Sequence, residues 1–134
     1  MDTVIESSVW VDYFRSKTPP AVRQIAGSAV NLKQAVIIEP VAFELLRSAH
    51  RPQRPTIEAH FATMRMLLTP ANLWRMATDL GKTCQDEGLV IPALDIVIAA
   101  ICLHHKAEVT TFDKHFPEIQ KVSALKVRFL TRPS

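Results

Sequence analysis

The segment Val90–Leu103 is almost wholly apolar and contains a single charged residue, Asp95. Pro92 is a favourable first-turn residue, so a core helix is predicted to begin there, with Asp95 in its opening turn. Burying an ionised carboxylate among Ile, Leu and Val costs free energy unless a partner compensates its charge. Three kinds of partner would compensate it: a basic side chain, the positive end of the helix, or a metal ion.

The composition is that of one folded domain. The 134 residues, 48% of them hydrophobic, suit a single domain over residues 1–134 with a sizeable core. Cys84 and Cys102 have no paired spacing and are predicted to be buried free thiols, which favours a cytoplasmic location. The apolar run around Asp95 falls short of the ~20 residues that cross a bilayer, so no membrane segment is predicted. The net charge of +3 is compatible with a nucleic-acid partner but does not indicate one.

The order of β-prone and helical segments predicts the fold class. Strands are predicted over residues 3–5, 35–38, 107–112 and 126–130. Residues 7–14 are expected to form a turn with an apolar helical turn in it. Helical patterns cover residues 19–29, 40–49, 56–68, 69–88 and the segment from Pro92, and residues 113–119 are expected to form a loop or a short helix. Pro52 and Pro55 are predicted to close the helix over residues 40–49. This alternation favours an α/β fold with a mostly parallel central sheet flanked by helices.

Three further acids occur in similarly apolar settings. Glu6 follows the first predicted strand, and Asp113 follows the strand over residues 107–112. Sites in open parallel sheets form at the carboxyl ends of the strands, where both of these acids are expected. Glu44 lies beside Leu45 on the helix predicted over residues 40–49. The chain thus carries four acids that can be brought to one edge of a sheet.

Each acid also has an ordinary structural explanation. Asp95 can stabilise the start of its helix, and Asp113 can begin a turn after its strand. Glu44 can pair with Arg47 on a solvated helix face. Glu6 can be a surface residue at a strand end. Taken singly, none of the four acids indicates a metal site.

Other polar and aromatic residues give weaker signals. No Cys/His spacing supports a zinc site, so the histidines, His115 included, are expected at the surface. Trp10 and Trp74 lie in apolar periodic segments and are expected to pack in the core or at an interface. Asp12 is expected to cap or pair locally, and Glu39 is expected to be peripheral to any metal site.

Four segments of the chain together resemble a known family. They are the residues ESSVW from Glu6 with the following VDYF, Glu44 in FELL, Asp95 in LDIVIAA, and TFDKHF over Thr111–Phe116. In order and spacing they resemble the four acidic motifs of PIN-domain ribonucleases, most closely the VapC-like toxins of toxin–antitoxin modules. The resemblance covers nearly the whole chain and is least distinctive over residues 52–88, where only helical character matches.

The resemblance implies a single PIN-like domain that acts as a metal-dependent endoribonuclease on single-stranded regions of RNA. One or two Mg²⁺ or Mn²⁺ ions are the expected cofactors, because these ions prefer oxygen ligands and make neighbouring acids compatible. No other cofactor is expected. The site residues carried over are the acids Glu6, Glu44, Asp95 and Asp113 and the supporting polar residues Ser8 and Thr111.

The resemblance also implies partners. The expected partners are an RNA substrate, a small cognate antitoxin that blocks the acids, and a second copy of the chain in a homodimer, with no membrane partner. The antitoxin groove is assigned to the helices over residues 40–68, with Phe61 and Met64 as exposed apolar residues. A basic rim that guides RNA, or else a set of solvated charges, is formed by Arg47, Arg51, Arg54, Lys114 and Lys121.

One position departs from the family pattern. The first acid of the family is usually Asp, whereas this chain has Glu6, whose carboxylate lies one methylene further from the backbone. Ligand distances in metal sites vary by only about 0.2 Å, so the longer side chain changes what this acid can bind. Two alternatives therefore stay open beside the toxin: a catalytically silent PIN-like binding module, and a PIN-like housekeeping nuclease of RNA processing.

Overall fold

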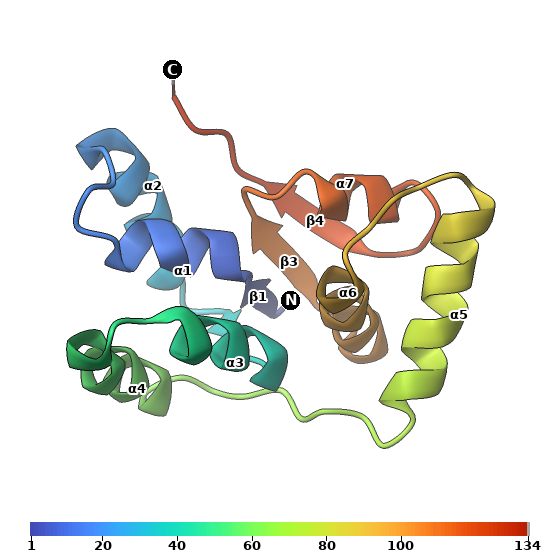
Figure 1. Ribbon diagram of the computed structural model, residues 1–134, viewed down its shortest axis with the longest axis horizontal. Helices are drawn as coiled ribbons and strands as arrows, with labels where there is room; N and C mark the ends of the chain where they lie inside the picture. Colours follow the sequence, from blue (N-terminus) through green and yellow to red (C-terminus); the bar gives the residue numbers. More distant parts are fainter. Residues whose placement is uncertain (134) are drawn as a thin grey trace.

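Four parallel strands form the centre of the molecule (Figure 1). The computed structural model describes residues 1–133, and within them the sheet has the order β2-β1-β3-β4. Its strands are β1 (Thr3–Ile5), β2 (Ala35–Val36), β3 (Glu108–Thr111) and β4 (Lys126–Phe129). Every pair of neighbouring strands runs parallel. The predicted α/β fold with a parallel central sheet is confirmed.

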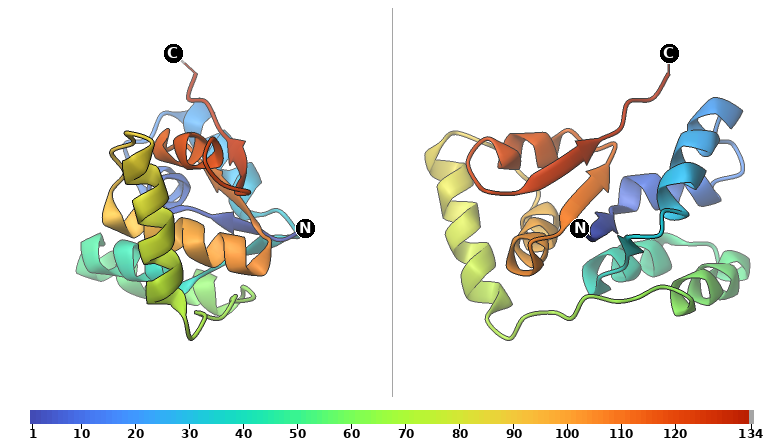
Figure 2. Two further views of the ribbon diagram at one scale, coloured as in Figure 1. Left: turned by 90° about the vertical axis from the view of Figure 1, so that its right-hand side faces the viewer. Right: turned by 180° about the vertical axis from the view of Figure 1, so that it is seen from behind.

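The helices fill the connections between the strands and lie around the sheet (Figures 1 and 2). Their bounds are α1 (Ser7–Phe14), α2 (Pro20–Val30), α3 (Glu39–Ser48), α4 (Arg54–Ala62), α5 (Leu73–Asp86), α6 (Ala93–His105) and α7 (His115–Gln120), with a 3-10 turn η1 over Arg51–Gln53. Helices α2 and α4 lie toward one end of the molecule and α5 at the other, with α6 between α5 and the sheet. No helix in the described residues is long and apolar enough to cross a membrane.

Helix α6 is the core helix that the apolar run predicts. It begins directly after Pro92 and ends where Lys106 adopts a left-handed conformation with φ 54°. Its residues from Ile98 to Cys102 are all buried, as expected for a helix that is apolar on every side. Helix α6 contacts α3, α5, α7 and β3, so its first turn is held against several elements at once.

The segment after α3 differs from the prediction. Pro55 lies in the first turn of α4 instead of closing a helix, a position where a missing N–H costs nothing. The helix predicted over residues 56–68 ends at Ala62, because the chain beyond it pairs with Ile37. Ile37 N–H donates to the Arg65 carbonyl at 3.1 Å, and Leu67 N–H donates to the Ile37 carbonyl at 3.0 Å. The strand predicted over residues 35–38 is therefore shorter: β2 ends at Val36, and Ile37 pairs with Met66 instead.

The aromatic residues divide between core and surface. Trp10 is fully buried, and its Nε1–H donates to the Ile5 carbonyl at 3.0 Å. Phe61 packs edge-on against Trp10 with ring centroids 5.0 Å apart. Phe61 and Met64 are half-buried against the core, so their prediction as exposed groove residues is wrong. Trp74 is 71% exposed, which excludes the core placement considered for it.

Three smaller predictions are decided by contacts in the fold. Cys84 and Cys102 are buried free thiols, as predicted, and burial raises the pKa of Cys102 to about 12. Asp12 does not pair locally, because its carboxylate accepts a hydrogen bond at 2.8 Å from Nε of Arg132 near the opposite end of the chain. Glu39 is exposed and accepts a hydrogen bond from the Thr69 hydroxyl, outside the acidic cluster.

Candidate metal centre and active site

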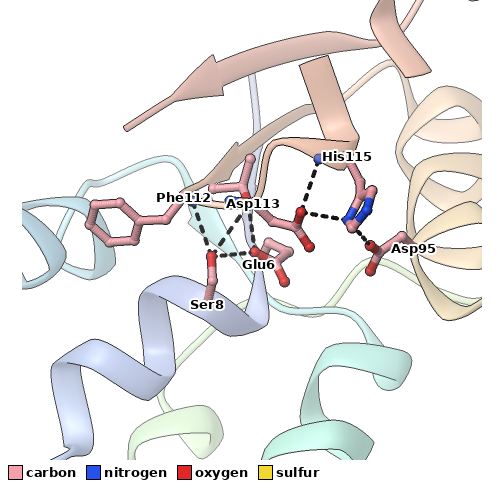
Figure 3. Close-up of polar contacts among 7 residues, drawn as sticks. Glu6, Ser8, Asp95, Phe112, Asp113 and His115 are labelled. Atoms are coloured by element: carbon pink, nitrogen blue, oxygen red, sulfur yellow. Dashed lines mark hydrogen bonds and ion pairs between the residues drawn. The ribbon is translucent and has the colours of Figure 1, made fainter. Parts of the chain in front are cut away.

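The acids approach one another where β1 and β3 end (Figure 3). These two strands are parallel neighbours, with Ile5 opposite Thr110, so the residues that follow them emerge at the same edge of the sheet. Glu6 follows β1 and Asp113 follows β3 by two residues. Asp95 approaches from the first turn of α6, which packs against β3 and α7. Three segments that are distant in the sequence thus meet at one place.

Glu6 is held by a network of hydroxyl groups. Its side chain is only 4% exposed, and its Oε1 atom accepts hydrogen bonds at 2.5 Å from both Ser8 Oγ and Thr111 Oγ1. These hydroxyls accept hydrogen bonds in turn from the backbone N–H groups of Phe112, at 3.0 Å, and Asp113, at 2.8 Å. Burial raises the pKa of Glu6, while the hydrogen bonds from Ser8 and Thr111 oppose that shift.

Asp95 has no comparable set of donors. Burial raises the pKa of its carboxyl group to about 8, and the negative charges of Asp113, Glu6 and Glu44 act in the same direction. Within the described residues, no Lys or Arg lies within ion-pair distance of Asp95. His115, whose Nδ1 atom is 3.4 Å from Asp95 Oδ2, is the one basic side chain near it in the described residues, so a divalent cation is the partner that would offset several acids at once.

His115 lies between two of the acids, contrary to its prediction as a surface residue. Its Nδ1 atom is 2.8 Å from Asp113 Oδ1 and 3.4 Å from Asp95 Oδ2 (Figure 3). The Nδ1 atom is buried, yet in the described part of the chain it has no hydrogen-bond partner of suitable geometry. Its backbone N–H donates to Asp113 Oδ1 at 2.9 Å. The spacing Asp113-Lys-His115 at the start of a short helix is the sequence signal that marks this residue.

Three of these side chains are placed as metal ligands would be, and we call them the ligand-like group. Asp95, Asp113 and His115 each offer one atom, and the three atoms lie within 4.8 Å of one another. Carboxylate oxygens and an imidazole nitrogen are ordinary ligands of divalent ions. Two observations fit a cation at this place. The buried Nδ1 atom lacks a hydrogen-bond partner in the described residues, and the raised pKa of Asp95 means that its carboxyl group keeps a proton that a cation would replace. Glu6 lies outside this group of three.

Glu44 joins the cluster from α3. It is half-buried, and Ser7 at the start of α1 donates a hydrogen bond to its Oε1 atom. Pairing with Arg47 on a solvated face, the alternative considered for Glu44, does not occur within residues 1–133. The negative charge of Glu44 contributes to the raised pKa of Asp95. The four predicted acids therefore influence one another across one region, although only two belong to the ligand-like group.

Comparison with solved structures finds the same fold in other proteins. Similar solved structures include VapBC2 from Rickettsia felis bound to a DNA fragment from its promoter, with 17% identity, a TM-score of 0.75, and coverage of 98% of this chain and 100% of that chain. FitAcB from Neisseria gonorrhoeae has 18% identity and a TM-score of 0.73 over 96% of each chain. VapBC-5 from Mycobacterium tuberculosis, of the VapBC family of toxin–antitoxin systems, has 18% identity and a TM-score of 0.66 over 96% and 98%.

At these identities the solved structures establish a shared fold. No curated protein sequence matches the chain. The family model of the PIN domain, however, matches residues 3–122, which span all the elements that contribute acids to the cluster. The chain therefore belongs to the PIN domain family.

Proposed function

We propose that this protein is a metal-dependent endoribonuclease and the toxin of a toxin–antitoxin pair. The observation that carries the proposal is the convergence of Glu6, Asp95 and Asp113 from three segments into one acidic cluster that lacks a Lys or Arg partner in residues 1–133. Membership of the PIN family supports nuclease chemistry, and the likeness to a VapBC toxin–antitoxin system supports the toxin role.

The side chains of the cluster have separate tasks in this proposal. Asp95 and Asp113 hold Mg²⁺ or Mn²⁺, which when bound lowers the pKa of a water molecule and stabilises charge on a phosphodiester. Glu6 has one oxygen engaged by Ser8 and Thr111, so its Oε2 atom is available to orient the attacking water. Glu44, fixed by Ser7, faces the same region from α3. No covalent nucleophile from the protein is needed.

The RNA would approach over basic side chains. The five candidates for the basic rim are all exposed. Lys114 adjoins Asp113 and is the one we assign to a phosphate near the cluster, because phosphate contacts dominate sequence-independent affinity. Arg51 and Arg54 lie in η1 and α4, toward the end of the molecule away from α6, where they would contact a longer RNA (Figure 1).

We assign the antitoxin to a cleft formed by helices. A cleft of about 400 Å³ lies between α1, α3 and α4, with Phe14, Leu45 and Ile57 among its apolar lining. Arg15 and Lys17 also line this cleft, which favours an acidic segment of the antitoxin. This placement keeps the groove on the helices over residues 40–68 but replaces Phe61 and Met64 as its lining. A homodimer stays part of the proposal on the strength of the family resemblance.

The decisive experiment measures cleavage of a panel of structured RNAs by purified, partner-free protein with Mg²⁺, Mn²⁺ or EDTA. We expect metal-dependent cleavage that Asp95→Asn abolishes. Asp79→Asn, on the exposed face of α5, is the matched control and should cleave like the wild type. Folded wild-type protein that cleaves nothing with either ion would reject the nuclease and favour the silent binding module.

A second measurement separates the toxin from a housekeeping nuclease. Induced expression of the chain in bacteria should arrest growth if it is a toxin, and Asp95→Asn should relieve the arrest. Cleavage in vitro without growth arrest would instead favour an RNA-processing role.

A further inference from the structure

The imidazole of His115 has a position that the proposed function does not use. Its Nδ1 atom is buried, lacks a hydrogen-bond partner within residues 1–133, and points toward the carboxylates of Asp95 and Asp113 (Figure 3). The Nδ1 atom lies only 2.8 Å from Asp113 Oδ1, but the contact lacks hydrogen-bond geometry. A buried polar atom without a partner is costly, and a ligand is one way to satisfy it.

Glu6, the first acid of the cluster, does not belong to the group formed by Asp95, Asp113 and His115. Glu6 Oε1 accepts two hydrogen bonds from hydroxyl groups. Hydroxyl groups of the protein thus engage Oε1 of Glu6, whereas the acids around Asp95 repel one another and His115 Nδ1 lacks a hydrogen-bond partner within residues 1–133. The centre of the ligand-like group is shifted from β1 toward the α6–α7 side.

We propose that His115 Nδ1 is a direct ligand of the divalent cation, together with Asp95 and Asp113, and that the site therefore prefers Mn²⁺ to Mg²⁺. Mg²⁺ strongly favours oxygen ligands in near-ideal octahedral geometry, whereas first-row transition ions accept imidazole nitrogen more readily. The lone pair of Nδ1 is then directed at the cation, and the ring proton resides on Nε2. The inference rests on the proposed function only in needing a cation at the cluster.

The test is a direct measurement of metal binding on tag-free protein. Continuous-wave electron paramagnetic resonance counts free Mn²⁺ during a titration, and pulsed measurements detect the ¹⁴N coupling of an imidazole bound to Mn²⁺. We expect ¹⁴N coupling in the wild type and its loss in His115→Gln, with Mn²⁺ affinity reduced about tenfold or more. His104→Gln, at an exposed position near the end of α6, is the matched control and should retain both signals.

A second variant tests the metal preference. His115→Asp provides a site made only of oxygen ligands, so the ratio of Mn²⁺ to Mg²⁺ affinity, measured by competition, should fall relative to the wild type. Bound Mn²⁺ without ¹⁴N coupling in the wild type, or unchanged Mn²⁺ affinity in His115→Gln, would overturn the inference and make His115 a counter-ion only. Those results would leave metal-dependent RNA cleavage intact. A folded wild type that binds neither ion would reject the proposed function as well.

Discussion

The two sides of the acidic cluster stabilise their carboxylates in different ways. On the β1–α1 side, Glu6 receives hydrogen bonds from Ser8 and Thr111, and backbone N–H groups fix those hydroxyls. On the α6–α7 side, Asp95 is surrounded by other acids, and His115 is the one basic side chain of the described residues within 4 Å of it. The first side takes its hydrogen-bond donors from the protein, although burial still raises the pKa of Glu6, whereas the second side lacks such donors and needs a proton or a cation. The difference indicates where metal binding and folding stability are coupled.

Replacing Asp95 tests the α6–α7 side most strongly. Asp95→Asn should reduce RNA cleavage to background because a cation ligand is lost. The same change should stabilise the metal-free protein at pH 8, on the order of 5 kcal/mol, because Asn need not ionise in a buried site. Urea unfolding in EDTA measures the stability, and Asp79→Asn should leave it unchanged. A destabilised Asp95→Asn protein would contradict the assignment of Asp95 as an uncompensated acid.

The pH dependence of stability tests the same side without a substitution. Folded Asp95 retains its proton to about pH 8, whereas the unfolded chain releases it near its ordinary pKa. Between these two pH values the folded state binds more protons, so its stability should fall as pH rises. The loss should be on the order of 4 kcal/mol between pH 5 and pH 8 in EDTA. Added Mn²⁺ should reverse it, with an increase in melting temperature that grows with pH.

Removing one hydroxyl group disturbs the β1–α1 side. Thr111→Val deletes a donor to Glu6 and the acceptor for the Asp113 N–H, so it should cost about 1–2 kcal/mol of stability. Thr110→Val is the matched control, because Thr110 is equally buried but shares its hydroxyl with Thr3. Both variants should lose stability, but only Thr111→Val should lower cleavage, about tenfold. Equal cleavage by the two variants would show that the hydroxyl network acts on folding alone.

The smallest expected effect comes from shortening Glu6. Glu6→Asp restores the usual first acid of the family but shortens the reach to Ser8 and Thr111. Cleavage with Mg²⁺ should rise severalfold relative to cleavage with Mn²⁺ if the longer side chain moves this acid out of the ligand group. An unchanged ratio of the two activities would assign Glu6 to the hydroxyl network only.

Much of the cluster could be predicted because its signals are local. Asp95 stands out as a charge in an apolar helix, and Glu6 and Asp113 directly follow strand-like runs whose parallel pairing brings their ends together. The sheet likewise follows from short β-prone segments separated by helices. These features depend on periodicity and on the order of segments along the chain, and both can be read directly from the sequence.

Features that depend on pairing between distant segments could not be predicted. Helix α4 ends at Ala62 because residues beyond it bond to Ile37, and nothing in the helical periodicity of residues 56–68 indicates that competition. Phe61 is half-buried because Trp10 lies opposite it. The direction of the His115 ring depends on where α7 begins relative to α6. In each case tertiary contacts override a local pattern.

The pairing of β1 with β3 also determines when the cluster can exist during synthesis. Glu6 is made early, but its hydrogen-bond partner Thr111 is made 105 residues later, just before the acid Asp113. A nascent chain that lacks β3 has neither the sheet register nor the second half of the cluster. The acidic cluster therefore cannot assemble before β3 has been made and has paired with β1.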